Sequence, residues 1–270
     1  MSKVIISIGP INIYWYSVLI LTAIILGYEL SLHYCKKNNI PEIIISDVLL
    51  GLVISAIIGA RAYFVIFKFD SYKDNIIDIF KIWEGGLAIY GGIIGGLIYL
   101  FFYSIKKKFS YTKLLDILSL PLLLGQAIGR WGNFFNQEAY GNIVTLEYLK
   151  SLHLPDFIIK GMYIEGSYRT PTFLYESLWC LVGVIILIFI RKSRKQHEGK
   201  QISFYLLWYG IGRFFIEGLR SDSLYLGEYR ISQIVSLILI VIGLLGNIII
   251  YLKNHKITKQ KTVITTDGRI

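Results

Sequence analysis

Three ionisable residues near the end of an apolar stretch have the spacing needed to hold an anion. In the segment WYGIGRFFIEGLR, Arg213, Glu217 and Arg220 follow one another at intervals of four and three residues. In a helix these intervals place all three side chains on one face. Two cations against one anion leave that face net positive, which suits a negatively charged ligand. A purely structural ion pair explains the same spacing equally well, so both interpretations stay open at this point.

A second group of polar residues interrupts the apolar pattern earlier in the chain. Residues 129–141 read GRWGNFFNQEAYG and carry Arg130, Asn133 and Glu138 between apolar runs. Glycine and asparagine are typical of turns, so a loop between two helices is the simpler interpretation. That interpretation does not account for Arg130 and Glu138. Ionisable side chains at membrane depth cost several kcal/mol and usually line a cavity or a substrate path.

The long apolar runs around these residues indicate a membrane protein. Hydrophobic residues make up 54% of the 270, charged residues make up 17%, and the mean hydropathy is +0.57. A helix crosses about 30 Å of hydrocarbon with roughly 20 apolar residues, whereas an outer-membrane barrel shows alternating segments of about 10. We therefore predict an all-α polytopic membrane protein, with residues 1–270 forming a single integral membrane domain of about seven transmembrane helices. The predicted helices are Ile11–His33, Ile43–Phe67, Gly85–Ser104, Leu114–Gly129, Thr172–Ile190, Ile202–Leu219 and Ile231–Leu252.

Lysine and arginine are distributed unequally between the two sides of these helices. The clusters at 106–108 and 191–195 and the basic segment 253–270 fall on the side with the greater number. By the positive-inside rule this side is cytoplasmic, so we expect the amino terminus outside and the carboxyl terminus in the cytoplasm. Residues 130–171 are then an extracytoplasmic loop, and residues 253–270 are a flexible, basic cytoplasmic tail. Because this orientation explains the formal net charge of +10, we expect no nucleic-acid partner.

With this orientation, seven polar residues lie in the outer half of the bilayer. Polar residues with unrelated structural roles would be scattered through the depth of the bilayer. The shared depth of these seven therefore favours one polar chamber open to the outer leaflet. Taken singly, a tyrosine here is more simply an interfacial aromatic, and a glutamate at a helix start can lie at headgroup level. The seven residues are Tyr16, Arg61, Tyr90, Arg130, Glu176, Arg213 and Glu217.

The paired glycines and the cysteines are interpreted as structural. In GGLAIYGGIIGG, Gly91 and Gly95 are four residues apart, a spacing that mostly means close helix packing, and Tyr90 is the side chain there that could touch a ligand. Cys35 lies at the end of the first apolar run and Cys180 inside a later one, and no metal-ligand spacing is present. We expect no disulfide, no metal and no cofactor.

The segment GRWGNFFNQEAYG resembles the prolipoprotein diacylglyceryl transferase family, whose motif GRxGNFxNxExxG is matched at every fixed position. The segments IYWYS, GAR, WEGGLAIYGG, TPTFLYE and YGIGRFFIEGLR extend the resemblance over nearly the whole chain, in family order. The resemblance implies a transferase of the bacterial plasma membrane, multi-pass and surrounded by membrane lipids. It implies transfer of a diacylglyceryl group from phosphatidylglycerol to the lipobox cysteine thiol of a preprolipoprotein signal peptide. Glycerol phosphate is released in this first step of lipoprotein maturation.

The resemblance also assigns roles to residues by motif position. The family's essential arginines fall on Arg130 and Arg213, and we add Glu217 and Tyr90 as candidate catalytic residues. The predicted site for phosphatidylglycerol comprises Arg130, Asn133, Glu138, Tyr16, Arg61, Glu176 and Arg220.

Tyr90 marks a departure from the family pattern. Many members have a histidine at this place, proposed as a base, whereas an unperturbed phenol has a pKa of about 10 and is a poor base at neutral pH. A neighbouring cation would have to lower that pKa, so the histidine's role does not carry over. Glu138, Glu176 and Glu217 stay open as alternatives that either accept a proton or orient the arginines.

The chemistry implied by the resemblance suits the two arginines. A guanidinium stays protonated and can hold two phosphate oxygens at once, so Arg130 and Arg213 are the expected phosphate clamp. The alternative from another functional class is an anion transporter. A transport path must continue across the membrane, but Glu29, Asp47 and Asp116 lie close to the cytoplasmic ends of their helices. The scarcity of ionisable residues in the inner halves therefore disfavours transport.

Overall fold

A computed structural model describes residues 3–9, 11–73, 75–193 and 197–267, and the side chains of 11, 84 and 254–267 fall outside that description. The chain divides into two compact units. The first comprises residues 1–27 and 115–270, and the second comprises residues 28–114. Helices α1 (Trp15–Lys37) and α4 (Tyr111–Asn136) each contribute residues to both units.

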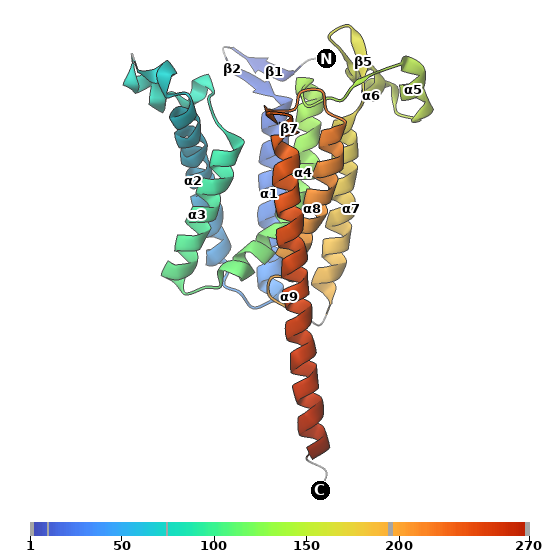
Figure 1. The fold of residues 1–270 in the computed structure, drawn as a ribbon. Helices are drawn as coiled ribbons and strands as arrows, with labels where there is room; N and C mark the ends of the chain where they lie inside the picture. The colour runs from blue at the N-terminus through green and yellow to red at the C-terminus, as the bar shows by residue number, and fades with distance from the viewer. Residues whose placement is uncertain (1–2, 10, 74, 194–196, 268–270) are drawn as a thin grey trace. The chain divides into compact units, whose positions relative to one another are not determined.

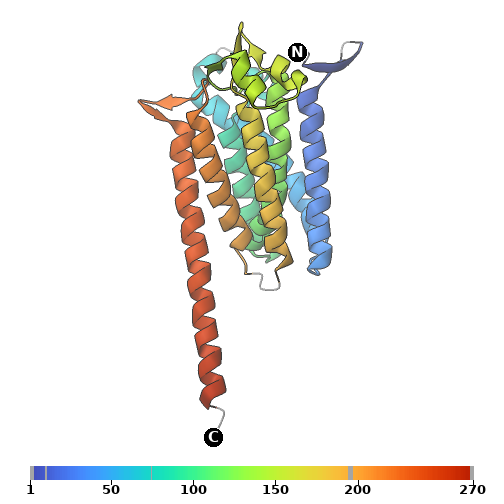
Figure 2. The same ribbon diagram turned by 90° about the vertical axis from the view of Figure 1, so that its right-hand side faces the viewer.

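Three long helices pack side by side in the first unit. Helix α8 (Lys200–Gly218) lies between α7 (Thr172–Lys192) and α9 (Ile231–Asp267) (Figure 1 and Figure 2). Trp179 of α7 and Trp208 of α8 stack with ring centroids 4.3 Å apart. Each indole N–H donates to the backbone carbonyl of the other residue at 2.9 Å. Helix α4 joins α7 through Ser177, whose hydroxyl donates to the carbonyl of Ala127 at 2.9 Å. The reciprocal tryptophan bonds hold α7 against α8, and the Ser177 bond holds α7 against α4.

The segment between α4 and α7 is a small folded structure. It contains α5 (Leu146–Ser151), α6 (Asp156–Gly161) and a three-stranded antiparallel sheet in the order β3-β5-β4. The strands are β3 (Ile143–Val144), β4 (Tyr163–Ile164) and β5 (Ser167–Arg169). Phe134 of α4 and Phe173 of α7 stack at 4.5 Å within an apolar cluster that includes buried Leu149. Burial of these side chains stabilises the segment on the helix ends.

Two antiparallel hairpins extend from the same end of the first unit (Figure 2). One pairs β1 (Val4–Ile8) with β2 (Ile11–Tyr14) directly before α1, and the other pairs β6 (Tyr225–Leu226) with β7 (Tyr229–Arg230) directly before α9. Each hairpin therefore sets where the following helix begins.

The second unit is built on the pair α2 (Ile43–Phe67) and α3 (Ile89–Lys107), joined by three 3₁₀ turns. The turns are η1 (Phe69–Tyr72), η2 (Ile76–Phe80) and η3 (Ile82–Glu84). A Cβ atom on Gly91 or Gly95 would collide with the backbone of α2. The predicted role of these glycines in close helix packing is confirmed.

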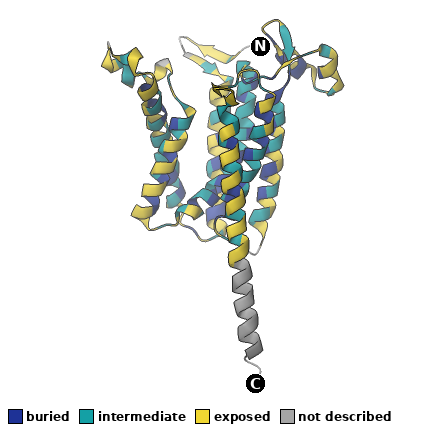
Figure 3. Ribbon diagram, in the orientation of Figure 1, coloured by how far each residue is buried: buried dark blue, intermediate teal, exposed yellow. Residues whose placement is uncertain are grey.

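Six described helices are long and apolar enough to cross a membrane, namely α1, α2, α3, α4, α7 and the part of α9 over residues 231–253. This confirms the predicted all-α polytopic fold. The predicted helix Ile202–Leu219 is present as α8, but it carries Arg213 and Glu217 and does not belong to the six. Exposed residues run along α9, whereas α7 and α8 carry more buried ones (Figure 3). The orientation of the two termini stays a prediction.

The predicted boundary between helix and loop at Gly129 is wrong. Helix α4 continues to Asn136, and the chain turns at Gln137, whose φ is 53°. The loop prediction took Gly132 as a turn residue. In the structure Gly132 is helical, and a Cβ there would lie 2.5 Å from Cδ2 of Tyr16, so this glycine permits close packing of α4 against α1. Arg130 consequently stands on a helix and not in a loop.

Other predicted boundaries also shift. The first helix runs over Trp15–Lys37 and not Ile11–His33, because residues 11–14 form strand β2. Helix α3 begins at Ile89 and not at Gly85, because Gly85 and Gly86 adopt left-handed φ values of 93° and 72° that end the preceding turn. Helix α9 continues into the predicted basic tail as far as Asp267, and residues 268–270 lie outside the described part. The cytoplasmic location of that tail stays a prediction.

Candidate functional site

Glu176 is the meeting point of three helices in the first unit. It lies in the second turn of α7 and is 3% exposed. Its Oε1 atom is 2.6 Å from Nη2 of Arg130 on α4, and its Oε2 atom is 3.1 Å from Nη1 of Arg213 on α8. The two arginines, remote in sequence, therefore converge on one carboxylate. A lone charge buried at this depth would be prohibitively costly, and this pairing compensates it.

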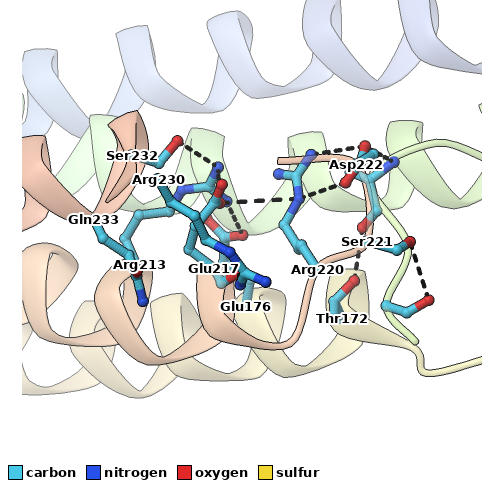
Figure 4. A network of polar contacts seen from close by, with 12 residues as sticks. Thr172, Glu176, Arg213, Glu217, Arg220, Ser221, Asp222, Arg230, Ser232 and Gln233 are labelled. Atoms are coloured by element: carbon cyan, nitrogen blue, oxygen red, sulfur yellow. Dashed lines mark hydrogen bonds and ion pairs between the residues drawn. The ribbon is translucent and has the colours of Figure 1, made fainter. Parts of the chain in front are cut away.

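Glu217 extends the same network along α8. Its Oε2 atom is 2.7 Å from Nη2 of Arg213, one turn earlier, and 3.9 Å from Nε of Arg220. Glu217 is 1% exposed. Figure 4 shows Glu176, Arg213 and Glu217 side by side, with Arg220 beyond them. The spacing predicted one helix face for Arg213, Glu217 and Arg220. Arg213 and Glu217 do share α8, but the helix ends at Gly218, so Arg220 reaches Glu217 from the segment that follows.

Arg220 is held in place by a carboxylate that sequence reasoning missed. Its Nε and Nη2 atoms donate to the two oxygens of Asp222, each at 2.9 Å. Asp222 Oδ2 also accepts the backbone N–H of Ala139 at 3.1 Å. Burial tends to raise the pKa of Asp222, but the hydrogen bonds and charge of Arg220 outweigh it and hold the pKa below its usual value. Arg220 and Asp222 are two residues apart, and neither helix nor strand periodicity predicts that such side chains form a bidentate pair.

Arg230, the last residue of β7, makes a further contact that sequence reasoning missed. Its Nη1 atom donates to the backbone carbonyl of Glu217. Ser232 lies 3.5 Å from Nη2 of Arg213. With these residues the network has four arginines, Arg130, Arg213, Arg220 and Arg230, against the carboxylates of Glu176, Glu217 and Asp222. With Glu138, which is linked to Arg130 through Asn133, the arginines and carboxylates of the network are equal in number.

The polar residues of the 129–141 segment connect to the same network. Arg130 Nη1 donates to Asn133 Oδ1 at 3.2 Å, and Asn133 Nδ2 donates to Glu138 Oε1 at 2.9 Å. Asn136 donates to the same oxygen at 3.3 Å. Glu138 therefore holds the amides that orient Arg130. It lies two residues after the end of α4 and contacts these amides, not the buried carboxylates.

The segment after α4 is fastened to the segment after α8. Gly141 and Arg220 form an antiparallel β-bridge, and the hydroxyl of Thr172 donates to the carbonyl of Ala139 at 2.6 Å. A Cβ on Gly141 would lie 2.9 Å from the carbonyl oxygen of Leu219, so glycine is needed for this close approach. The bridge brings the two sequence motifs together at the ion network.

A model of the family described as prolipoprotein diacylglyceryl transferase matches residues 3–249. The chain belongs to this family. A phosphatidylglycerol–prolipoprotein diacylglyceryl transferase of Listeria monocytogenes serotype 4b is 48% identical over 251 residues, covering 93% of this chain and 90% of the relative. Proteins of the same name from Halalkalibacterium halodurans and Bacillus cytotoxicus are 47% and 49% identical. They cover 91% of this chain and 85% and 90% of the relatives, respectively.

Membership of the diacylglyceryl transferase family confirms the predicted enzyme class. The chain is a transferase, so the transporter alternative is not supported. The relatives are bacterial, and the apolar helices indicate a multi-pass membrane protein. Within the described residues, no group of three or more His, Cys, Asp or Glu side chains is arranged to hold a metal ion.

Not every predicted site residue joins the network. Tyr16 lies at the start of α1 against Gly132 of the family motif, and its side chain is partly exposed. Arg61 and Tyr90 belong to the second unit, so their part in the transferase site stays a prediction. Arg61 is buried and donates to the carbonyls of Asp78, Ile79, Gly85 and Gly86, which gives it a local role in folding the turns after α2.

Proposed function

We propose that this chain transfers the diacylglyceryl group of phosphatidylglycerol to the lipobox cysteine thiol of a preprolipoprotein. The names of its relatives support both substrates. The observation that carries the assignment of the site is the convergence of Arg130 and Arg213 on Glu176. Two guanidinium groups held this close can also take the two free oxygens of one phosphodiester.

The reaction balances with the residues of the site. The thiolate sulfur forms a bond to the glyceryl carbon, and the bond from that carbon to the phosphate oxygen breaks. The leaving glycerol phosphate keeps the electron pair, and its developing negative charge is stabilised by Arg130 and Arg213. The thiol proton passes to a base, for which Glu217 is our candidate. Glu176 and Glu138 are alternatives that also orient arginines.

The proposed site faces the outer leaflet. The asymmetry of lysine and arginine puts 106–108 and 191–195 on the cytoplasmic side, and the ion network is at the opposite ends of α4, α7 and α8. At that depth the network meets phospholipid headgroups, while the apolar helix faces contact the acyl chains. A signal peptide crossing the membrane would present its lipobox cysteine at the same level.

The test is direct transfer by the purified protein. Incubation with phosphatidylglycerol and a lipobox peptide should raise the peptide mass by one diacylglyceryl group, measured by mass spectrometry. A peptide with serine in place of the cysteine is the control and should stay unmodified. Lack of transfer to the cysteine peptide by folded protein, or flux of a solute without lipid transfer, would contradict the proposal.

A further inference from the structure

A column of polar side chains continues from the arginines into the core of the first unit. On α8, Tyr205, Tyr209 and Arg213 follow one another at intervals of four residues, so they share one face. On α4, Gln126 precedes Arg130 by the same interval. Helices rise about 5.4 Å per turn, so Gln126 and Tyr205 lie about one and two turns further in than the arginines of their own helices. The proposed chemistry at the arginines does not use this column.

Contacts join the column across the two helices. Gln126 Nε2 donates to the hydroxyl of Tyr205 at 2.9 Å. The rings of Tyr205 and Tyr209 stack with centroids 5.9 Å apart and planes 2° from parallel. Tyr209 lies one turn before Arg213 on the same face of α8. Polar side chains therefore follow one another along α8 from Arg213 to Tyr205, which contacts the Gln126 amide.

Only one of the two polar atoms of the Gln126 amide has a hydrogen-bond partner among the described residues. Its Oε1 atom is buried and, among the described residues, has no hydrogen-bond donor. A buried acceptor without a donor costs free energy, and within a membrane-spanning bundle bulk water does not supply one. A Cβ placed on Gly129, three residues further along α4, would meet no described atom within 4 Å. The unpaired acceptor therefore lies about one helical turn from Arg130 on the same helix.

We propose that Gln126, oriented by Tyr205, forms a subsite that accepts a hydrogen bond from a neutral hydroxyl of the phospholipid headgroup. This inference rests on the proposed function. With the phosphate on Arg130 and Arg213, a hydroxyl on a short headgroup can bridge the distance of about one turn to Gln126. The neighbouring arginines repel an ammonium group, so the subsite selects a glycerol headgroup over an ethanolamine headgroup.

The test compares a donor lipid that has headgroup hydroxyls with one that has none. Phosphatidylglycerol and phosphatidylethanol carry the same phosphodiester, but the second has an ethyl group in place of glycerol. Wild type should prefer phosphatidylglycerol, because a site built to bind a hydroxyl rejects an analogue without it. Gln126→Leu should lower kcat/KM for phosphatidylglycerol roughly ten- to hundredfold and change that for phosphatidylethanol by less than about twofold. Tyr205→Phe should weaken the preference in the same direction.

Ser119→Ala is the matched control, because Ser119 is a buried polar residue of α4 whose hydroxyl is satisfied by the carbonyl of Leu115 at 2.7 Å. It should keep the wild-type preference. If Gln126→Leu does not accumulate, Gln126→Asn keeps the amide but withdraws its carbonyl, and the same loss of preference is expected. An equal fall with both lipids, no change with either, or a wild type without preference would overturn the subsite. A wild type that modifies the peptide from neither lipid would overturn the proposed function, and the subsite with it.

Discussion

Arg130 of α4 and Glu176 of α7 form a buried ion pair in which Nη2 and Oε1 are 2.6 Å apart. The side chain of Glu176 is 4% exposed and that of Arg130 is 18% exposed, so both charges are largely removed from solvent. Because Arg213 contacts the other oxygen of Glu176, one carboxylate fixes the distance between two guanidinium groups. This geometry determines what the site can bind and which substitutions test it.

Lysine substitution separates charge from geometry at the two arginines. Arg130→Lys and Arg213→Lys keep the positive charge but lose the planar fork that holds two oxygens. If each arginine stabilises the departing phosphate, the loss is about 3 to 4 kcal/mol, which corresponds to a rate on the order of a hundredfold to a thousandfold lower. Peptide mass measurements give the rate, and immunoblots of membranes give the amount. Normal turnover in a well-folded lysine variant would contradict its assignment to the phosphate clamp.

Removal of the charge on Glu176 tests whether its ion pairs with Arg130 and Arg213 stabilise the folded protein. Glu176→Gln leaves Arg130 and Arg213 without their shared anion, and breaking a buried pair costs about 3 to 5 kcal/mol. Thermal unfolding in detergent should therefore occur at a clearly lower temperature. Glu165→Gln is the control, because Glu165 is 68% exposed and its contact with Arg169 is long, at 3.4 Å. Equal unfolding temperatures for the two variants would show that Glu176 is not a structural anchor.

Asp222 predicts a dependence of stability on pH. Its pKa is held below the usual value by Arg220, against the opposing effect of burial. A depressed pKa means that the pair stabilises the folded state fully above the unfolded-state pKa of about 3.9, and that this stabilisation is lost as the pH falls through the lower folded-state value. The difference in unfolding temperature between wild type and Asp222→Asn should be present at pH 7 and shrink below about pH 4. A difference that grows in acid would have the wrong sign.

Gly132 tests the contact between α4 and α1. A Cβ in Gly132→Ala would lie 2.5 Å from the Tyr16 ring, so the ring must move and the family motif loses its packing partner. We expect the purified Gly132→Ala variant to unfold at a lower temperature than wild type and to transfer the diacylglyceryl group more slowly. Gly125→Ala on the same helix is the control, because its Cβ would meet Ala23 at an ordinary 3.9 Å. That control should be neutral or stabilising by up to about 1 kcal/mol. Stability as high in Gly132→Ala as in Gly125→Ala would refute the packing role.

Cysteine labelling tests the orientation in the membrane. In intact cells, Lys150→Cys should react with an impermeant thiol reagent and Lys107→Cys should be shielded, since the positive-inside rule puts these positions on opposite sides. The native Cys35 and Cys180 are buried and should give little background. Labelling of Lys107→Cys alone would place the ion network at the cytoplasmic face.

Local features of the sequence determined the fold class and part of the site. Hydropathy gave the membrane helices because a span must satisfy its own backbone and expose apolar side chains to lipid. The interval between Arg213 and Glu217 sufficed to place them on one face of α8, since helix geometry alone sets that relation, whereas Arg220 lies beyond the end of the helix. The family motif could also be identified from the sequence, because its residues are neighbours along the chain.

Tertiary structure decided the relations between helices. Glu176 is remote in sequence from both arginines it contacts, and no interval along the chain specifies which carboxylate meets which guanidinium. Only the packing of α4, α7 and α8 does so. The same holds for Asp222, which links Arg220 to the backbone of Ala139 across the fold. Turn propensity also misplaced the end of α4, because the contact of Gly132 with Tyr16 outweighs the local preference of glycine for a turn.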